Sequence, residues 1–203
     1  MKGIKRCIGI LVALLLLGGG TSHALTGLGL GLRAGTLSMD DPNTEESVDG
    51  MTMVGGHLKI GTLPIIDLEV SGEYAWKDYD YTLPIEGVGE QRAEVTYHHF
   101  SLNGSAKYAV SLPASPVRPY VGAGLGMHFI GSSVKLPDVG YEVPLDEDFT
   151  ESKTGLHGLA GLSLSLPLFP LEMFAEGRYA AIFTKDKSTK ARSLYAGLTL
   201  KLP

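Results

Sequence analysis

The fold of this chain is decided by the ten residues YVGAGLGMHF, from Tyr120 to Phe129. The odd positions of this stretch are apolar, while the even positions carry glycine, Tyr120 or His128. Alternation with a period of two places successive side chains on opposite faces of a β-strand. The stretch therefore predicts a strand with one apolar face and one glycine-rich polar face.

The same alternation predicts seven further strands. They lie near residues 28–34, 54–60, 67–76, 99–110, 156–165, 171–183 and 193–202. The connections alternate between long or polar segments (38–50, 77–93, 131–153 and 184–191) and short segments with proline (62–65, 111–118 and 167–170). Bacterial outer-membrane barrels combine an even strand number with this asymmetry of turns and loops. The predicted fold class is an all-β, eight-stranded antiparallel up-and-down transmembrane barrel.

Ten charged residues fall on the polar face of these strands, and their signs balance. They are Arg33, Lys59, Lys107, Arg178 and Lys201 against Asp67, Glu69, Glu73, Glu172 and Glu176. Charges inside a protein must be paired, whereas charges on a solvated face need not balance. Glycine and serine on the same face suit the narrow interior of a small barrel. We therefore predict that the polar face lines the lumen, opposite to a soluble lipocalin-like barrel.

Aromatic residues on the apolar face favour the same orientation. They lie near the strand ends, at Tyr74, Trp76, Tyr108, Phe129 and Phe183. Interfacial girdles of membrane barrels occupy such positions. The apolar face is therefore expected to contact lipid.

Composition and the N-terminus fit an exported protein. Residues 1–24 combine three positive charges, an apolar stretch from Ile8 to Leu17 and the small residues Ser22 and Ala24, which together predict a signal peptide. The barrel domain is then expected over residues 25–203 in the bacterial outer membrane. A single cysteine excludes a disulfide framework, and a net charge of −5 argues against nucleic acid as a partner.

Two segments resemble a known family. Pro119–Gly126 is similar to the fifth-strand signature of the small OmpA-like or opacity-type outer-membrane β-barrel family, and Gly158–Ser163 with Phe174–Tyr179 resembles its next hairpin. The resemblance implies an eight-stranded barrel without known activity in many members, and an adhesive or protective role in some. It also implies outer-membrane lipids, lipopolysaccharide and the barrel assembly machinery as partners. The chain departs from the family in ending on Leu202-Pro203 rather than on an aromatic residue.

Three histidines are the candidate metal ligands. If the strands are centred on their connections, His99 faces roughly position 129 and His128 faces His157, which brings all three onto one inner face. Neighbouring positions on adjacent strands are about 5 Å apart, close enough to share a metal ion. The favoured interpretation is nonetheless that these histidines are interior packing residues.

Two further patterns are weaker candidates for a functional site than the three histidines. His99 and Ser101, with Glu69 or Glu73 to orient the histidine, could form the nucleophilic site of a lipid A-modifying hydrolase. Their face is expected to be interior, away from lipid. The stretch Gly29–Ala34 matches G-x-G-x-x-G/A, but these glycines alternate within a strand instead of opening a helix. We therefore predict no catalytic, cofactor-binding or metal-binding residues.

The long connections carry charge of one sign. Residues 38–50 contain five acidic residues and no Lys or Arg, residues 131–153 are also acidic, and only the last loop, with Lys185, Lys187 and Lys190, is basic. Divalent cations or an extracellular ligand could bind there. The sequence thus predicts an outer-membrane barrel with a structural or surface-binding role through acidic extracellular loops and no catalysis. A lipid A-modifying hydrolase or a narrow channel for small solutes is the alternative.

Overall fold

The computed structural model describes residues 27–40, 47–63, 66–85, 89–110, 115–136, 141–143, 152–165, 169–183 and 188–202. The predicted signal peptide lies outside these ranges. Within them the chain forms β1 (Leu28–Asp40), β2 (Ser47–Leu63), β3 (Ile66–Ile85), β4 (Gly89–Ala109), β5 (Val117–Leu136), β6 (Tyr141–Val143), β7 (Lys153–Ser165), β8 (Leu171–Phe183) and β9 (Ser188–Leu202). No helix in the described ranges is long and apolar enough to span a membrane.

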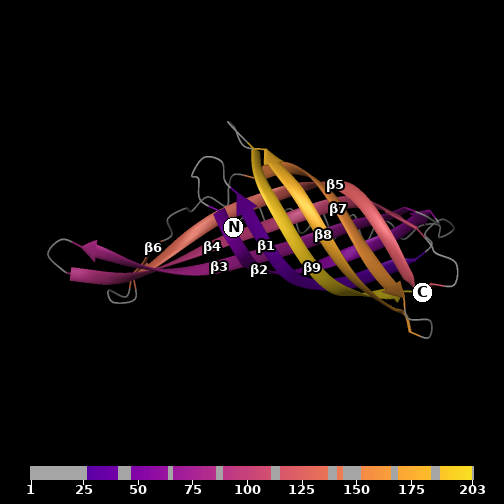
Figure 1. Cartoon of the computed structure of the whole chain (residues 1–203), viewed down its shortest axis with the longest axis horizontal. Coiled ribbons are helices and arrows are strands. Elements are labelled where there is room, and N and C mark those ends of the chain that lie inside the picture. Colours follow the sequence, from indigo (N-terminus) through magenta and orange to yellow (C-terminus); the bar gives the residue numbers. More distant parts are fainter. Residues whose placement is uncertain are drawn as a thin grey trace, which may run out of the picture.

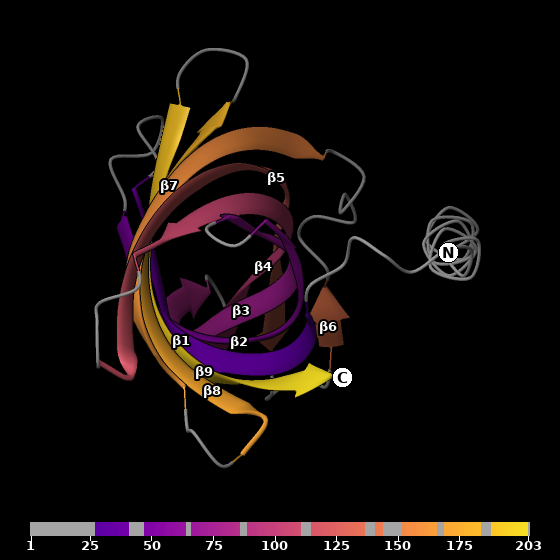
Figure 2. The ribbon, with the colours of Figure 1, turned by 90° about the vertical axis from the view of Figure 1, so that its right-hand side faces the viewer.

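Eight of these strands close into a barrel. Each pairs with its neighbours in antiparallel fashion in the order β4-β3-β2-β1-β9-β8-β7-β5, and a β4–β5 pairing closes the ring. Figure 2 shows the strands curving around one enclosed interior. Closure gives each of the eight strands a paired neighbour on both sides. The predicted fold class is confirmed, with β6 as an additional short strand on β5.

The two ends of the barrel differ. At the terminal end, Leu28 of β1 pairs with Leu202 of β9. At the opposite end, which we call the hairpin end, β3 and β4 continue side by side to the pair Ile85 and Gly89. Figure 1 shows this hairpin projecting beyond the other strands, away from the C-terminus. Among the described residues, the hairpin end therefore carries the strands that project furthest from the ring.

All four of the predicted long connections are partly strand. Residues 38–40 and 47–50 belong to β1 and β2, and residues 77–85 and 89–93 belong to β3 and β4. Residues 131–136 belong to β5, residues 141–143 form β6 and residues 188–191 belong to β9, so the loop predictions are wrong over these positions. Alternation of apolar and polar residues indicates a strand with one face that is buried or faces lipid. Beyond the lipid the outer face of a strand meets water, so the pattern of apolar outer and polar inner residues is lost although the backbone pairing continues.

The face orientation is as predicted. Side chains that point outward form an apolar surface with large exposed fractions, for example Leu32 at 74%, Leu125 at 65% and Leu194 at 67%. Ser71 and Glu73, on the other face of β3, are buried at 2% and 4% exposure. An apolar exterior around a buried polar interior is the arrangement of a membrane barrel.

Glycines on the inner face make room for rings. A Cβ atom added at Gly31 would lie 2.3 Å from Cε1 of His57, and one added at Gly124 would lie 2.6 Å from Nε2 of His157. Real Cβ atoms essentially never approach so closely. Much of the high glycine content on this face therefore serves to seat aromatic and imidazole side chains in a narrow lumen.

Candidate functional site

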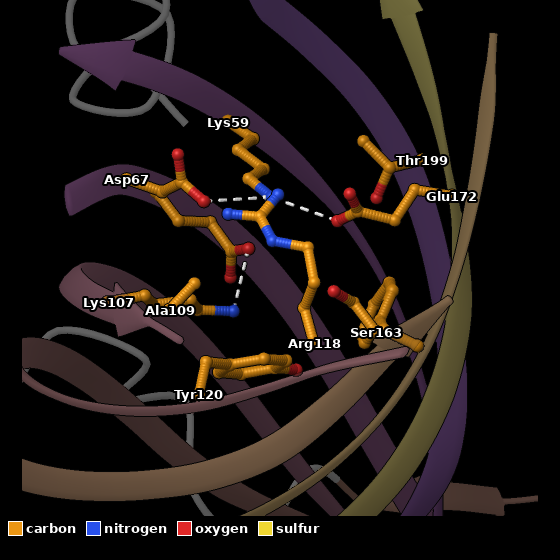
Figure 3. A pocket seen from close by; sticks show the side chains of 11 residues that line it. Lys59, Asp67, Lys107, Ala109, Arg118, Tyr120, Ser163, Glu172 and Thr199 are labelled. Atoms are coloured by element: carbon orange, nitrogen blue, oxygen red, sulfur yellow. Dashed lines mark hydrogen bonds and ion pairs between the residues drawn. The ribbon is translucent and has the colours of Figure 1, made fainter. Parts of the chain in front are cut away.

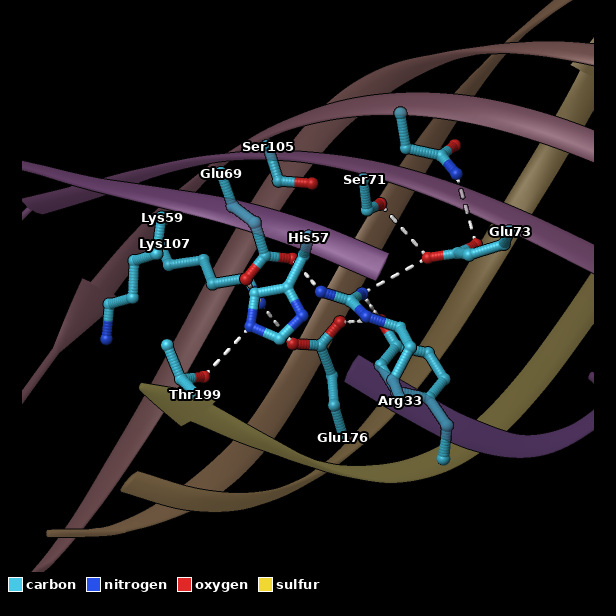
Figure 4. Close-up of polar contacts among 12 residues, drawn as sticks. Arg33, His57, Lys59, Glu69, Ser71, Glu73, Ser105, Lys107, Glu176 and Thr199 are labelled. Atoms are coloured by element: carbon cyan, nitrogen blue, oxygen red, sulfur yellow. Dashed lines mark hydrogen bonds and ion pairs between the residues drawn. The ribbon is translucent and has the colours of Figure 1, made fainter. Parts of the chain in front are cut away.

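A network of charged side chains fills the middle of the lumen, and we call it the ionic layer. Its members are Arg33, Glu69, Glu73, Lys107, Glu176 and Arg178, with the phenols Tyr120 and Tyr195. The carboxylate of Glu69 accepts from Arg33 at 2.5 Å and from Lys107 at 2.8 Å. Figure 4 shows Arg33, Glu69, Glu73, Lys107 and Glu176 converging from β1, β3, β4 and β8. Every charge of the layer has an opposite charge as neighbour.

The ionic layer crosses the whole lumen. Arg178 donates from Nη1 to both carboxylate oxygens of Glu73, at 2.7 and 2.9 Å. Their strands, β8 and β3, are separated by β2, β1 and β9 around the ring and so stand on opposite walls. Lys107 of β4 likewise reaches Glu176 of β8 at 2.6 Å. The walls are therefore tied together through the interior as well as around the ring.

A second group of ion pairs lies nearer the terminal end. Nζ of Lys59 is 2.9 Å from both Asp67 and Glu172, and Nζ of Lys201 is 3.1 Å from Glu172. Together, this group and the ionic layer contain all ten charges that were predicted to face inward, and each of these charges lies in an ion pair. The prediction of a balanced, paired interior is confirmed.

A small cavity lies beside this second group. Its volume is about 20 Å³, close to the room needed by one water molecule. Lys59, Asp67 and Glu172 line it together with Arg118 and Tyr120, as Figure 3 shows. Since charges of both signs surround so little space, the cavity offers no selective site for a solute.

Toward the hairpin end, the lumen is filled by apolar side chains that the sequence analysis missed. This apolar layer contains Leu37, Met39, Met51, Met53, Ala75, Ala180, Ile182 and Ala191, all buried. Val48, Tyr97 and Ile130 pack against it. A signal was present, because Met51 and Met53 alternate in phase with the inward His57. Met51 and Met53 nonetheless lie outside the predicted strand, which begins at residue 54, and Met39 lies in the predicted loop 38–50.

The three candidate histidines do not converge. Nε2 of His99 lies 3.2 Å from Nδ1 of His128, in stacked rings. His157 is paired with Gly124 instead of His128, and its Nε2 bonds to the hydroxyl of Ser105 at 2.8 Å. The predicted facing of His128 and His157 is therefore wrong, because His128 pairs with Lys153. Among the described residues, no group of three or more His, Cys, Asp or Glu could hold a metal ion.

The candidate hydrolase site in the lumen does not form either. His99 and Ser101 are 4% and 2% exposed and point into the barrel, away from lipid. Ser101 donates to Glu73, while the ring of His99 bonds to His128. The stretch Gly29–Ala34 lies inside β1 and is paired on both sides, by β2 and β9, so it opens no helix.

The comparisons with known proteins agree with this architecture. The family described as "Outer membrane protein beta-barrel domain" matches residues 10–201. The chain belongs to this outer-membrane β-barrel family. It is accordingly a protein of the bacterial outer membrane, surrounded by the lipids of that membrane. No curated protein matches the chain significantly.

Solved structures show that the family fold is shared. Neisserial surface protein A superposes with a TM-score of 0.64 at 19% identity, over 89% of this chain and 100% of that protein. Ail, the attachment invasion locus protein of Yersinia pestis, superposes with a TM-score of 0.55 at 12% identity, over 87% of this chain and 99% of Ail, in a complex with the heparin analogue sucrose octasulfate. At these identities the likeness concerns the fold alone.

Proposed function

We propose that this outer-membrane barrel is a closed, non-conducting scaffold that presents its hairpin end as a binding surface outside the cell. In this proposal residues 1–24 direct export, residues 25–203 form the barrel, and the lumen carries no catalysis. The observation that carries the proposal is the double obstruction of the lumen. The ionic layer ties opposite walls together, and the apolar layer above it excludes water.

The obstruction argues against a channel for small solutes. Eight strands enclose a space that side chains can fill. Here Ile182 and Met51 of the apolar layer are 0% and 2% exposed. A hydrated ion would have to displace both the apolar side chains and the buried ion pairs.

The binding surface is expected to favour cationic partners. Asp49, Asp78 and Asp80 are exposed at the hairpin end, where β3 and β4 project beyond the other strands. The adjoining sequences 38–50 and 131–153 are also acidic. A sulfated polyanion, such as the one bound to Ail, would be repelled by this surface. Divalent cations, which can bridge carboxylates to lipopolysaccharide phosphates, fit its charge.

Two experiments test this function. In planar lipid bilayers the purified barrel should show no stable conductance, and a steady open channel would contradict a closed scaffold. The barrel should also retain lipopolysaccharide more strongly in Mg²⁺ than in a chelator, and D78N/D80N should reduce that difference. Equal retention with and without Mg²⁺ would contradict cation bridging.

Orientation is tested on intact cells. Leu28 at the start of β1 and Leu202 at the end of β9 lie at the same end of the barrel, and we expect that end to face the periplasm. Epitope tags inserted at residues 44 and 146 should then be accessible to antibodies from outside, whereas a label at residue 115 should not. Labelling at residue 115 alone would invert the proposed orientation.

A further inference from the structure

A serine, a histidine and a tyrosine form a hydrogen-bonded row on the outer face of the barrel. The hydroxyl of Ser133 lies 3.4 Å from Nε2 of His98, and Nδ1 of the same ring lies 2.6 Å from the hydroxyl of Tyr74. The row crosses three adjacent strands, β5, β4 and β3. Its order is that of a nucleophile, a general base and a group that orients the base.

Strand pairing explains how the row forms. Trp76 and Gly131 are the direct partners of His98 on either side. Tyr74 and Ser133 each lie two positions along their own strand from the residue that is directly paired with His98. His98 therefore reaches both of them diagonally across the sheet. Diagonal neighbours on one face of a sheet remain within reach of long and aromatic side chains. The ring of Tyr74 further stacks on Trp76, with centroids 5.7 Å apart, which limits its movement.

The row lies where the apolar surface of the barrel ends. Toward the terminal end the same face carries Phe100 and Phe129, with ring centroids 6.0 Å apart, and the exposed Leu102. Toward the hairpin end it carries Thr96, which donates to Asp78. Aromatic residues of membrane barrels mark the depth of the lipid headgroups. Ester bonds join acyl chains to headgroups at that depth.

Strand β4 spans the membrane over the expected length. Ten residue steps separate His98 from Tyr108, the exposed aromatic residue near the terminal end of the same strand. A tilted transmembrane strand needs about 9–11 residues. Ser133 therefore faces one lipid boundary, and in the proposed orientation this is the outer leaflet.

We propose that Ser133 and His98 are the catalytic residues of an acyl-transfer site, and that Tyr74 is its positioning residue. The substrate class is the acyl esters of outer-leaflet lipids. This inference goes beyond the proposed binding role and replaces the expectation of no catalysis for the lipid-facing surface. It shares no residue with the buried His99 and Ser101.

The reaction is a hydrolysis in two steps. In the first step, Oγ of Ser133 attacks the ester carbonyl carbon while Nε2 of His98 takes the hydroxyl proton. The C–O bond to the rest of the lipid then breaks, and Nε2 of His98 gives the proton to the leaving alkoxide. Water next attacks the acyl-serine and gives one proton to His98. The bond to Ser133 breaks, its oxygen regains that proton, and a fatty acid leaves. Throughout, Nδ1–H of His98 donates to Tyr74.

We assign stabilisation of the developing oxyanion to peptide groups of β5 near the serine. Among the described residues, β7 pairs with β5 only as far as His128, and β6 pairs with it only from Val134. Between these positions, the edge of β5 carries peptide groups that no described strand uses. Peptide N–H groups are effective donors to a tetrahedral oxyanion.

The test measures fatty acid release by the folded, full-length mature barrel in mixed micelles. Two substrates are compared, phosphatidylethanolamine and lipopolysaccharide, because both carry acyl esters at the same depth. Wild type should release fatty acid from at least one of them. Ser133→Ala should abolish this release, and His98→Gln should lower the rate by about 10²–10⁴-fold. Absence of release from both lipids would overturn the proposal.

The matched control is Ser132→Ala, which removes the neighbouring hydroxyl from the opposite face of β5. It should release fatty acid at the wild-type rate, and it should react with a long-chain fluorophosphonate probe as wild type does. Ser133→Ala should not react with this probe. Equal labelling of the two variants, with both shown to be folded by heat-modifiable gel migration, would also overturn the proposal.

Tyr74→Phe separates positioning from packing. Phenylalanine keeps the stacked ring and removes the hydroxyl that orients His98. We expect kcat to fall about 3- to 10-fold, which corresponds to the loss of one hydrogen bond, and KM to remain unchanged. A change in KM alone would show that Tyr74 only shapes the lipid-contacting surface.

Discussion

The ionic and apolar layers fill the same lumen by different physical means. In the ionic layer each group is held by several directed contacts: Glu176, for example, accepts from Lys107, Tyr120 and Tyr195. In the apolar layer, Met51 and Ile182 are held by close packing without direction. The ionic layer is therefore expected to fix which residues face each other across the barrel, while the apolar layer mainly excludes water.

The largest effect should come from breaking the ionic layer. Glu176→Ala removes the carboxylate that Lys107 contacts at 2.6 Å and that Arg178 approaches at 3.5 Å. Lys107 and Arg178 keep Glu69 and Glu73 as partners, but the layer is left with three buried positive charges against two negative ones. Loss of one partner from buried ion pairs costs about 3–5 kcal/mol. We expect this loss in the free energy of unfolding, measured by urea titration of the barrel in lipid vesicles.

The outcome also tests the assignment of faces. A loss below about 1 kcal/mol, as at a solvated pair, would mean that water reaches the ionic layer. The double variant E176A/K107A supplies the control, since it removes both charges of one pair. It should be more stable than Glu176→Ala alone if the excess buried positive charge is the cause, because it leaves two positive charges against two negative ones.

Sequence reasoning predicted the ionic layer and missed the apolar one for a physical reason. Charges such as Arg33 and Glu73 stand out against lipid-facing neighbours, so their period of two is visible. In the apolar layer the inward residues, such as Met51 and Met53, are apolar like the lipid-facing Val54, so polarity does not distinguish the two faces. The chain pattern thus reports contrast between faces, and it is uninformative where that contrast disappears.

Register was the second limit of the sequence. Centring β5 and β7 on their connection placed His128 opposite His157, whereas the structure pairs His157 with Gly124. The extension of β5 to Leu136 and the short strand β6 shift that centre. The outward row of Tyr74, His98 and Ser133 was missed for a related reason, since residues 131–153 were assigned to a loop.

An intermediate effect is expected where a glycine seats a ring. Gly124→Ala would place a Cβ atom 2.1 Å from the carbonyl oxygen of Gly104 and 2.6 Å from Nε2 of His157. Overpacking of this kind costs about 1–3 kcal/mol. The matched control is Gly158→Ala on the outer face, where nothing lies within 4 Å of an added Cβ. Equal urea midpoints for the two variants would show that inward glycines are not needed for ring packing.

A smaller effect is expected within the apolar layer. Met51→Leu keeps the volume and the apolar character of a side chain that is 2% exposed. Such volume-conserving exchanges usually cost less than about 1.5 kcal/mol. The barrel should therefore remain folded and closed, with no conductance in planar bilayers. A stable conductance in this variant, with the ionic layer intact, would mean that the apolar layer alone closes the lumen by a specific fit.

The smallest effect is expected at an ion pair outside the lumen. Arg192 lies 2.5 Å from Asp40 at the hairpin end, and their side chains are 60% and 38% exposed. Water solvates both charges in the unfolded and the folded barrel, so the pair contributes only about 0–1 kcal/mol. Arg192→Ala should shift the urea midpoint far less than Glu176→Ala does, and added salt should reduce even that difference. A loss as large as that of Glu176→Ala would mean that burial is not what makes the ion pairs of the lumen important for stability.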